Sequence, residues 1–495
     1  MTYTTAKAGR YFTRSTWIGN VVPPDGSDLI VNHKLTVDGN ISPAVVFVGN
    51  DGNFVFDPRK NITVRMQKNF IRYGGLSMHP ASASFNHLLL FPNVDESLFS
   101  GPIPEFDVVP DDTGLWIRGN GILDLIGSPR TLWTNLTAGV LKGAKSIPVK
   151  DPAMWRVGDQ LCIAPTTPIT DKNFYKGFDY VGIEKIVKNV IYLDKPLEFD
   201  HPAAVHPNNG NTFYAEVINT TSNVRIEGTP TGRAHINIMA EGIALPQNVV
   251  IRHMGPQIGG EVVKGRYPLH FHMNGNSMAG TVLRNVLIMD SGGHGFVTHA
   301  SHGIKMIGCA TLRVQNHAYW GDTPVNNSTD PSNNSNNISY IRCLAAQTMQ
   351  GARPFYRLSD FFLGSGTGNM ICKCVGVGNN GDKGSAMINY PESSNMMDNN
   401  WIDEDNIAHN IRSNGMMNWQ NDDTDHQIKR FTAYNCGLIG IEQGAYTNGY
   451  KFDNIQLFGN GLGIKLYSLP SPNGIPDQWG YIVHFKDVDS SDGLL

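Results

Sequence analysis

Charged residues, basic clusters and long apolar runs are all scarce in this chain. Charged residues make up 17% of the 495 residues, and long helices need such residues on their exposed faces, so helices are not expected to dominate. The net charge is −4 and no basic block occurs, which argues against a nucleic-acid partner. Because no run of 18 apolar residues is present, the sequence predicts no membrane span.

Cysteine is also scarce. Six cysteines without a CxxC pair are too few for a disulfide framework in a chain of this length, and we expect them to be small buried side chains. Residues 1–14 form a polar leader without the apolar core of a secretory signal. We therefore expect a protein of the virion surface or tail, or one that is extracellular by a route without a classical signal peptide.

Short strands with turns are what the chain has in abundance. Glycine occurs 53 times, and runs such as LIVNHKLTVDG and GLWIRGNGILDLIG alternate apolar and polar residues around turn residues. This pattern indicates short strands with hairpin-like turns, and we interpret residues 15–205 as a β-rich domain.

A loose repeat follows after residue 213. Short β-rich runs such as TVLRNVLIMD and NMICKCVGVG begin roughly 22 to 33 residues apart, the length of one coil of a parallel β-helix. The sequence therefore predicts an all-β chain with a right-handed parallel β-helix over residues 213–495, preceded by the β-rich domain. Tandem β-sandwiches are the alternative, but they would show regular hairpins.

Histidines gather between residues 265 and 322. His270 and His272 lie two apart on a predicted strand and point the same way, while Leu269 and Phe271 point to the opposite face, into the core. His294 follows His270 by 24 residues, and both His317 after His294 and His299 after His272 keep a similar spacing. This coil-length spacing predicts that these imidazoles stack in neighbouring coils.

Such a row of imidazoles can bind a metal or carry out acid–base chemistry. We predict His270, His272, His299 and His317 as catalytic residues. The first three are also candidate ligands for a divalent metal, calcium or zinc, although no cysteine joins them and no HExxH motif indicates zinc. A structural, hydrogen-bonded role is the alternative for each.

A carboxylate and a stacking surface complete the predicted site. Most glycosidases use carboxylates, and Asp322 is the best candidate because it follows His317 by five residues. Sugar rings stack on aromatic faces, so Tyr267, Tyr319 and Trp320 are predicted to bind substrate together with Arg266.

These motifs resemble the eight-glycine domain family, which includes the cell-migration-inducing hyaluronidase, the hyaluronidase known as transmembrane protein two, and fibrocystin. YPLHFHMNG at 267–275 resembles the family's YPxHFH, and VTHASHGI at 297–304 resembles its VTVHGxNGL. NHAYW at 316–320 resembles its GHCFF, but GDTP follows in place of the family's acidic residue. Colinear segments extend the resemblance over about residues 16 to 325.

The resemblance implies a glycan-related site on a β-helix behind an eight-glycine-type domain. An endo-acting depolymerase of a long glycan, a hydrolase or a lyase, is the first hypothesis. A glycan-binding tail fibre, tailspike or adhesin without turnover is the second, and a rigid structural spike is the third. The expected partner is a polysaccharide, and side-by-side solenoids favour a homotrimer.

Overall fold

The computed structural model describes residues 1–104, 107–321, 334–351, 358–390, 401–419, 426–444, 449–466 and 483–493. These residues contain strands and two short 3-10 helices, η1 (Arg14–Thr16) and η2 (Glu96–Leu98), but no α-helix. None of their helices has the length and apolarity that a membrane crossing requires. The prediction of an all-β chain built on a parallel β-helix is confirmed.

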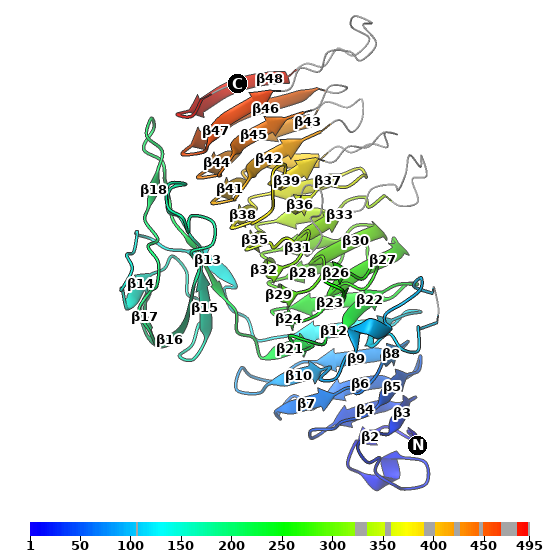
Figure 1. The fold of residues 1–495 in the computed structure, drawn as a ribbon. Coiled ribbons are helices and arrows are strands. Elements are labelled where there is room, and N and C mark those ends of the chain that lie inside the picture. Colours follow the sequence, from blue (N-terminus) through cyan, green and yellow to red (C-terminus); the bar gives the residue numbers. More distant parts are fainter. Residues whose placement is uncertain are drawn as a thin grey trace, which may run out of the picture. The chain divides into compact units, whose positions relative to one another are not determined.

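The chain divides into two compact units. The first consists of residues 1–129, 222–304 and 351–353, and the second of residues 130–221, 305–350 and 354–495. Each unit is described by itself. Both contain coils whose strands pair in parallel with the equivalent strands of the next coil (Figure 1).

Parallel ladders form the sides of the first unit. A separate small hairpin consists of β25 (Gln257–Ile258) and β26 (Glu261–Val262). One ladder contains β1 (Thr2–Thr4), β3 (Asp28–Val31), β5 (Val45–Val48), β8 (Phe70–Arg72), β11 (Gly114–Ile117), β22 (His235–Ile238), β27 (Leu269–Gly275) and β30 (Phe296–Ser301). Another contains β2 (Gly9–Arg10), β4 (Lys34–Val37), β6 (Asn53–Phe56), β9 (Gly75–Met78), β12 (Ile122–Ile126), β23 (Ile243–Gln247) and β28 (Val282–Arg284). The last contains β7 (Ile62–Arg65), β10 (His87–Leu90), β21 (Val224–Glu227), β24 (Val250–Arg252) and β29 (Leu287–Ser291).

The parallel coils begin much earlier than the expected boundary at residue 213. β5 and β6 are consecutive in the chain, yet β5 pairs with β3 and β8 while β6 pairs with β4 and β9. The turns between such strands are therefore coil corners and not the hairpin turns that we expected. Both arrangements bury alternate side chains, so the period-two pattern fits either one.

The second unit has parallel ladders of the same kind. One contains β33 (Tyr319–Gly321), β36 (Ser359–Phe362), β39 (Ala386–Tyr390), β42 (Asn414–Asn418), β45 (Ile439–Gln443) and β47 (Leu462–Leu466). Another contains β31 (Lys305–Ile307), β34 (Ser339–Ile341), β37 (Asn369–Cys372), β40 (Trp401–Glu404), β43 (His426–Lys429), β46 (Tyr450–Phe458) and β48 (Val483–Ser490). The last contains β32 (Ala310–Val314), β35 (Leu344–Ala346), β38 (Val375–Val377), β41 (Ile407–His409) and β44 (Thr432–Tyr434), and β44 pairs with β46.

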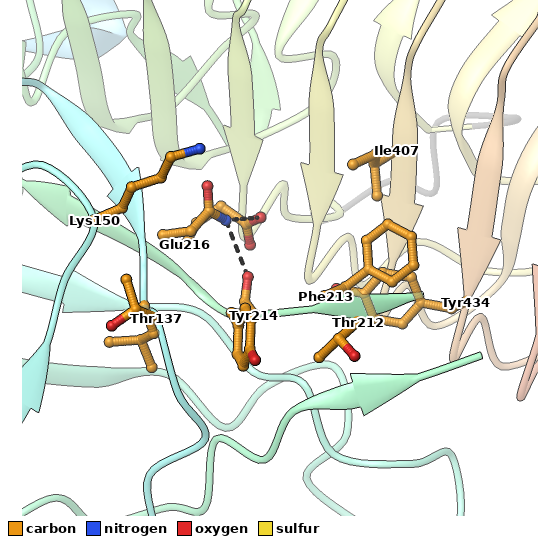
Figure 2. A pocket seen from close by; sticks show the side chains of 10 residues that line it. Thr137, Lys150, Thr212, Phe213, Tyr214, Glu216, Ile407 and Tyr434 are labelled. Atoms are coloured by element: carbon orange, nitrogen blue, oxygen red, sulfur yellow. Dashed lines mark hydrogen bonds between the residues drawn. The ribbon is translucent and has the colours of Figure 1, made fainter. Parts of the chain in front are cut away.

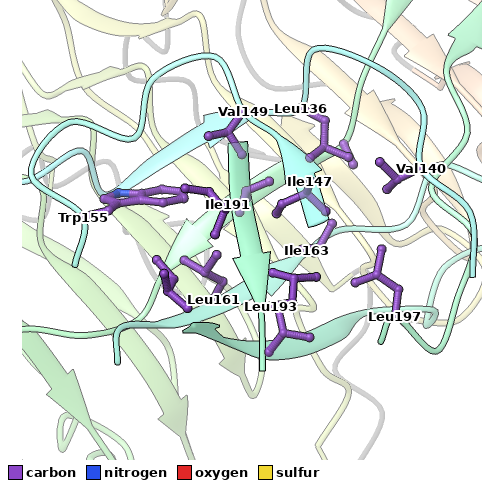
Figure 3. Close-up of a cluster of buried hydrophobic side chains, with 14 residues drawn as sticks. Leu136, Val140, Ile147, Val149, Trp155, Leu161, Ile163, Ile191, Leu193 and Leu197 are labelled. Atoms are coloured by element: carbon purple, nitrogen blue, oxygen red, sulfur yellow. The ribbon is translucent and has the colours of Figure 1, made fainter. Parts of the chain in front are cut away.

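An antiparallel sheet completes the second unit. Its order is β13 (Trp133–Asn135), β20 (Glu216–Asn219), β15 (Gln160–Ile163), β16 (Asp179–Val187), β17 (Val190–Leu193) and β14 (Ser146–Pro148), and β18 (Ala204–Val205) pairs with β19 (Thr212–Phe213) nearby. Figure 3 shows its own apolar core, in which Trp155 packs with Leu161, Ile191 and other aliphatic side chains. This core gives the segment independent local packing.

Asparagines hold the corners of the coils. Asn285, Asn337 and Asn435 have φ angles of 50°, 56° and 51°, in the left-handed region that Asn tolerates better than most residues. Other asparagine side chains satisfy the backbone at bends: the Asn406 Oδ1 accepts a hydrogen bond from the Cys374 amide at 2.8 Å. The abundance of asparagine next to apolar runs thus follows from the coil geometry.

Candidate functional site

The predicted histidine row exists in the first unit, and we call His270, His272 and His299 the imidazole face. β27 and β30 are neighbours in one ladder, and His272 pairs directly with His299. Their rings lie 4.8 Å apart and 14° from parallel, and both side chains are half-buried. The 27-residue spacing therefore did predict this stack, and Leu269 and Phe271 are fully buried as expected.

His270 lies beside this pair but makes different contacts. It pairs in register with Asn237 and Val297, and not with His294 as we predicted. Its ring is 4.7 Å from that of His272 and is 3% exposed. Its Nδ1 donates to the Gly265 carbonyl at 2.8 Å, which leaves Nε2 as the acceptor nitrogen.

Burial keeps the imidazoles of His270 and His272 neutral. It lowers the pKa of His272 to about 3, with the neighbouring His299 as the next cause, and it lowers the pKa of His270 well below the usual value. The His272 Nδ1 is buried and has no hydrogen-bond partner among the described residues. At neutral pH, both side chains are therefore uncharged, so each can accept a hydrogen bond at its unprotonated nitrogen but cannot act as an acid.

Metal binding by the imidazole face is not supported by its geometry. In the described part of the chain, no group of three or more His, Cys, Asp or Glu side chains is arranged to hold a metal ion. The rings of His272 and His299 are nearly parallel, so their in-plane lone pairs do not converge on one point. These residues do not fit the divalent metal that the sequence suggested.

Arg118 and Asn237 are part of this face, although no sequence motif indicates them. Arg118 follows β11 and is fully buried, and its Nη1 donates to the Asn237 carbonyl at 3.3 Å. Its Nε and Nη2 have no hydrogen-bond partner among the described residues, although the guanidinium lies 5.0 Å from the centre of the Trp116 ring. Its charge contributes to the lowered pKa of His272. Only the register of β11, β22 and β27 brings these positions together.

Arg266 and Tyr267 are structural, which corrects their predicted role in substrate binding. Arg266 is 2% exposed and its Nη2 lies 2.6 Å from Asp112. The same Nη2 donates to the Ser100 carbonyl, Nη1 donates to the carbonyls of Gly101 and Lys264, and Nε donates to Asp112. Tyr267 is 4% exposed and packs against His270 and His294 at 4.9 and 5.0 Å. Neither side chain has a surface left for a sugar.

Asp112 and Glu96 anchor a segment of the first unit that the structure describes over residues 92–104 and 107–113. Glu96 binds Arg233 at 2.7 Å, and Phe99 packs on His235 at 5.8 Å. Burial raises the pKa of Asp112, although Arg266 opposes the rise. We call residues 92–104 and 107–113 the covering segment, because its Phe99 packs on the buried His235 of β22.

His317, Tyr319 and Trp320 belong to the second unit. Tyr319 is fully buried and stacks on Phe361 at 4.5 Å, so it cannot form the predicted sugar-binding rim. His317 is 1% exposed, and its Nδ1 accepts from the Ser359 amide at 3.1 Å. Trp320 is half-buried, with its ring 6.2 Å from that of His317. Asp322 lies outside the described residues.

The neutral histidines predict a loss of stability in acid. In the unfolded chain these imidazoles bind protons below about pH 6.5, whereas in the folded chain His272 stays neutral to about pH 3 and His87 to about pH 4. The unfolded state then holds more protons, so the free energy of unfolding falls as the pH falls through this window, by about 1.4 kcal/mol per pH unit for each such histidine. Asp403 opposes the trend, because burial raises its pKa to about 7.

Urea unfolding at pH 7.0, 5.5 and 4.5 measures this effect. The variant His272→Gln cannot titrate at this position and should lose less stability between pH 7.0 and 4.5 than the wild type. A free energy of unfolding that is constant or rises toward pH 4.5 would contradict the buried, neutral state of these side chains.

Parallel coils with a row of imidazoles along one ladder define the class: a parallel β-helix protein with a polar face. The CEMIP beta-helix family model matches residues 232–335, the segment that contains the imidazole face. A G8 domain-containing protein of Dictyostelium discoideum is 23% identical over 256 residues, which cover 50% of this chain and 21% of that protein. Protein rliB of the same organism is 22% identical over 322 residues, covering 62% and 27%.

These sequence matches confirm the resemblance to the eight-glycine (G8) domain family. The chain spans only about a quarter of the length of these relatives. Among solved structures, the tailspike of an Acinetobacter baumannii bacteriophage in complex with a capsular saccharide matches with a TM-score of 0.24 and 10% identity, covering 94% of this chain and 64% of that one.

Proposed function

We propose that this protein engages a long polysaccharide along the imidazole face and cleaves it at internal positions. The observation that carries the proposal is the half-exposed stack of His272 on His299, which offers flat rings and acceptor nitrogens on a ladder of parallel strands. The resemblance to a family that includes hyaluronidases supports a glycan as the ligand. The tailspike likeness adds no argument about the ligand.

The chemistry of the face favours an acidic sugar and a lyase. Neither His270 nor His272 is bonded to a carboxylate among the described residues, so the carboxylate pair of most glycosidases is not assembled around them. A sugar carboxylate bound beside His272 would raise the pKa of this imidazole, since an opposite charge favours the protonated form. His272 would then take the C5 proton of a uronate, and the C5–H electron pair would form the C4=C5 double bond. The C4–O bond breaks at the same time, and the departing sugar oxygen keeps the electron pair of that bond and takes a proton from water.

Glycan binding without cleavage is the second candidate. The same lack of a carboxylate partner favours it, because a binding face needs only hydrogen-bonding groups and ring surfaces. An extracellular or virion-surface location belongs to either version of the proposal. So does assembly as a homotrimer, which sedimentation velocity of the purified chain would measure.

Incubation with four polymers tests cleavage: hyaluronan, alginate, polygalacturonate and the neutral glycan dextran. We expect at least one uronate polymer to shorten rapidly, with new reducing ends and the ultraviolet absorbance of an unsaturated product, and EDTA should not change the rate. Reducing ends without that absorbance would indicate hydrolysis and contradict the lyase chemistry. Binding to a polymer without any new ends would establish the second candidate, and neither binding nor cleavage would refute both.

A further inference from the structure

A groove of two adjoining cavities lies in the second unit, between the antiparallel sheet and the later coils of that unit. The first cavity, of about 350 Å³, is lined by residues that include Asn135, Lys150, Tyr214, Glu216 and Tyr434. The second, of about 370 Å³, is lined by residues that include Asn211, Arg430, Asn454 and Gln456. Thr212, Phe213 and Ile407 line both cavities, so Phe213 stands at the middle of one continuous groove.

The middle of the groove has an aromatic surface. Phe213 is half-buried, and its ring lies 5.3 Å from that of Tyr434 and 5.7 Å from that of Phe458. Tyr434 is itself fixed, because it stacks between Phe458 at 5.1 Å and His409 at 4.6 Å. The ring of Phe213 is thus supported by Tyr434 and Phe458 and also lines the groove, and such a ring suits the apolar face of a sugar.

The first cavity also has a fixed polar wall. Glu216 is 3% exposed; its Oε1 accepts from the Asn135 Nδ2 at 3.0 Å and its Oε2 is 2.8 Å from the His409 Nε2. Lys150 is exposed and forms no ion pair with another residue in the described part of the chain. Figure 2 shows Lys150 and Glu216 on one side of the pocket, with Phe213 and Tyr434 on the other.

Hydroxyl-rich ligands fit the second cavity best. The guanidinium of Arg430 is bound by Glu404 at 2.8 Å and Asp405 at 2.6 Å, so its charge is compensated and a phosphate backbone gains little there. The Asn211 amide donates to Gln456 at 2.9 Å, and Asn454 adds a further amide. Planar amides and paired charges offer both donors and acceptors, which sugar hydroxyls use in equal measure.

We propose that this groove is a second carbohydrate site, which binds a short stretch of a linear glycan with one sugar ring on Phe213. The site is separate from the imidazole face, since none of its residues belongs to the first unit. It is a binding site and not a catalytic one, because both oxygens of Glu216 are engaged by protein groups. The inference goes beyond the proposed function and does not depend on cleavage at His272.

Calorimetric titration of the full chain tests the proposal with four probes: the hexasaccharides of hyaluronan, alginate, polygalacturonate and cellulose. The titrations use the His272→Ala background as well as the wild type, so that cleavage does not consume the probe. At least one hexasaccharide should bind in both backgrounds, and Phe213→Ala should weaken its binding at least 10-fold.

Two further variants make the result decisive. Thr137→Trp starts from an exposed residue of the first cavity and should block binding by filling that cavity, even if Phe213→Ala fails to fold. Tyr192→Ala is the matched control: this tyrosine is 40% exposed in the same unit and lines neither cavity. No binding of any probe to the wild type, or binding that both Phe213→Ala and Thr137→Trp leave unchanged, would overturn the second site. Cleavage of a polymer in the reducing-end assay would survive either result.

Discussion

Replacing His272 by alanine is expected to reduce polysaccharide cleavage by roughly 10²–10⁴-fold, the usual effect of removing a proton acceptor. The side chain is half-buried at the end of a fully packed strand segment, so its loss should cost only about 1–2 kcal/mol of unfolding free energy. Initial rates of product formation with the polymer that the wild type cleaves, together with thermal melting, measure the two effects separately.

Substitutions of His79 and His317 are the comparisons for His272→Ala. His79→Ala removes an imidazole that is 40% exposed and pairs with Asp124, and it should leave the rate unchanged. His317→Ala removes a buried imidazole that accepts from the Ser359 amide, and we expect it to lower stability. Its burial does not favour the role in turnover that the sequence predicts for it. Full activity in His272→Ala would show that the imidazole face is structural.

The largest expected loss of stability comes from Asp112→Ala. Arg266 is 3% exposed at the side chain and Asp112 is fully buried, so the substitution leaves a guanidinium in the interior without its carboxylate. Removing one partner of a buried ion pair typically costs about 3–5 kcal/mol. The free energy of unfolding from urea titration should fall by this amount, and the covering segment should become more sensitive to protease.

Arg252→Ala is the matched control in the same unit. Arg252 pairs with Asp290 at 2.8 Å but is 42% exposed, and exposed pairs contribute less than about 1 kcal/mol. If Asp112→Ala and Arg252→Ala lose equal stability, the pair of Arg266 and Asp112 does not anchor the covering segment. Asp112→Asn should fall between the two, because it keeps the shape and one acceptor oxygen.

Features that depend on one strand or on a fixed coil length could be predicted from the sequence. The alternation of Leu269, His270 and Phe271 fixes which side chains enter the core, and the interval from His272 to His299 equals the local coil length. Both inferences depend only on residues within the coils and not on segments that pack against the coils from outside. The same is true of the asparagines, because their φ preference acts at a single residue.

Features that depend on contacts between distant segments could not be predicted. The sequence around Arg266 and Tyr267 looks like a polar rim, but the covering segment, more than 150 residues earlier, buries Arg266. The predicted role of Tyr319 in the sugar-binding rim was wrong for a similar reason, since the ring on which it stacks, Phe361, comes from the next coil. The groove was missed because Glu216 and His409 are 193 residues apart and neither lies in a histidine-rich motif.

The antiparallel segment also sets the order in which the first unit can be completed. β10 pairs with β21, and β12 pairs with β23, although residues 130–221 lie between the paired strands in the sequence. The strand of His87 therefore has no neighbour on that side until the strand of Val224 is present. Lengthening a loop adds little to the closure cost, about 0.6 kcal/mol per doubling, so the penalty falls on folding speed more than on final stability. During synthesis the early coils must therefore persist with an open strand edge until residue 227 has been made, and this exposed edge is where a nascent chain would mispair with its neighbours.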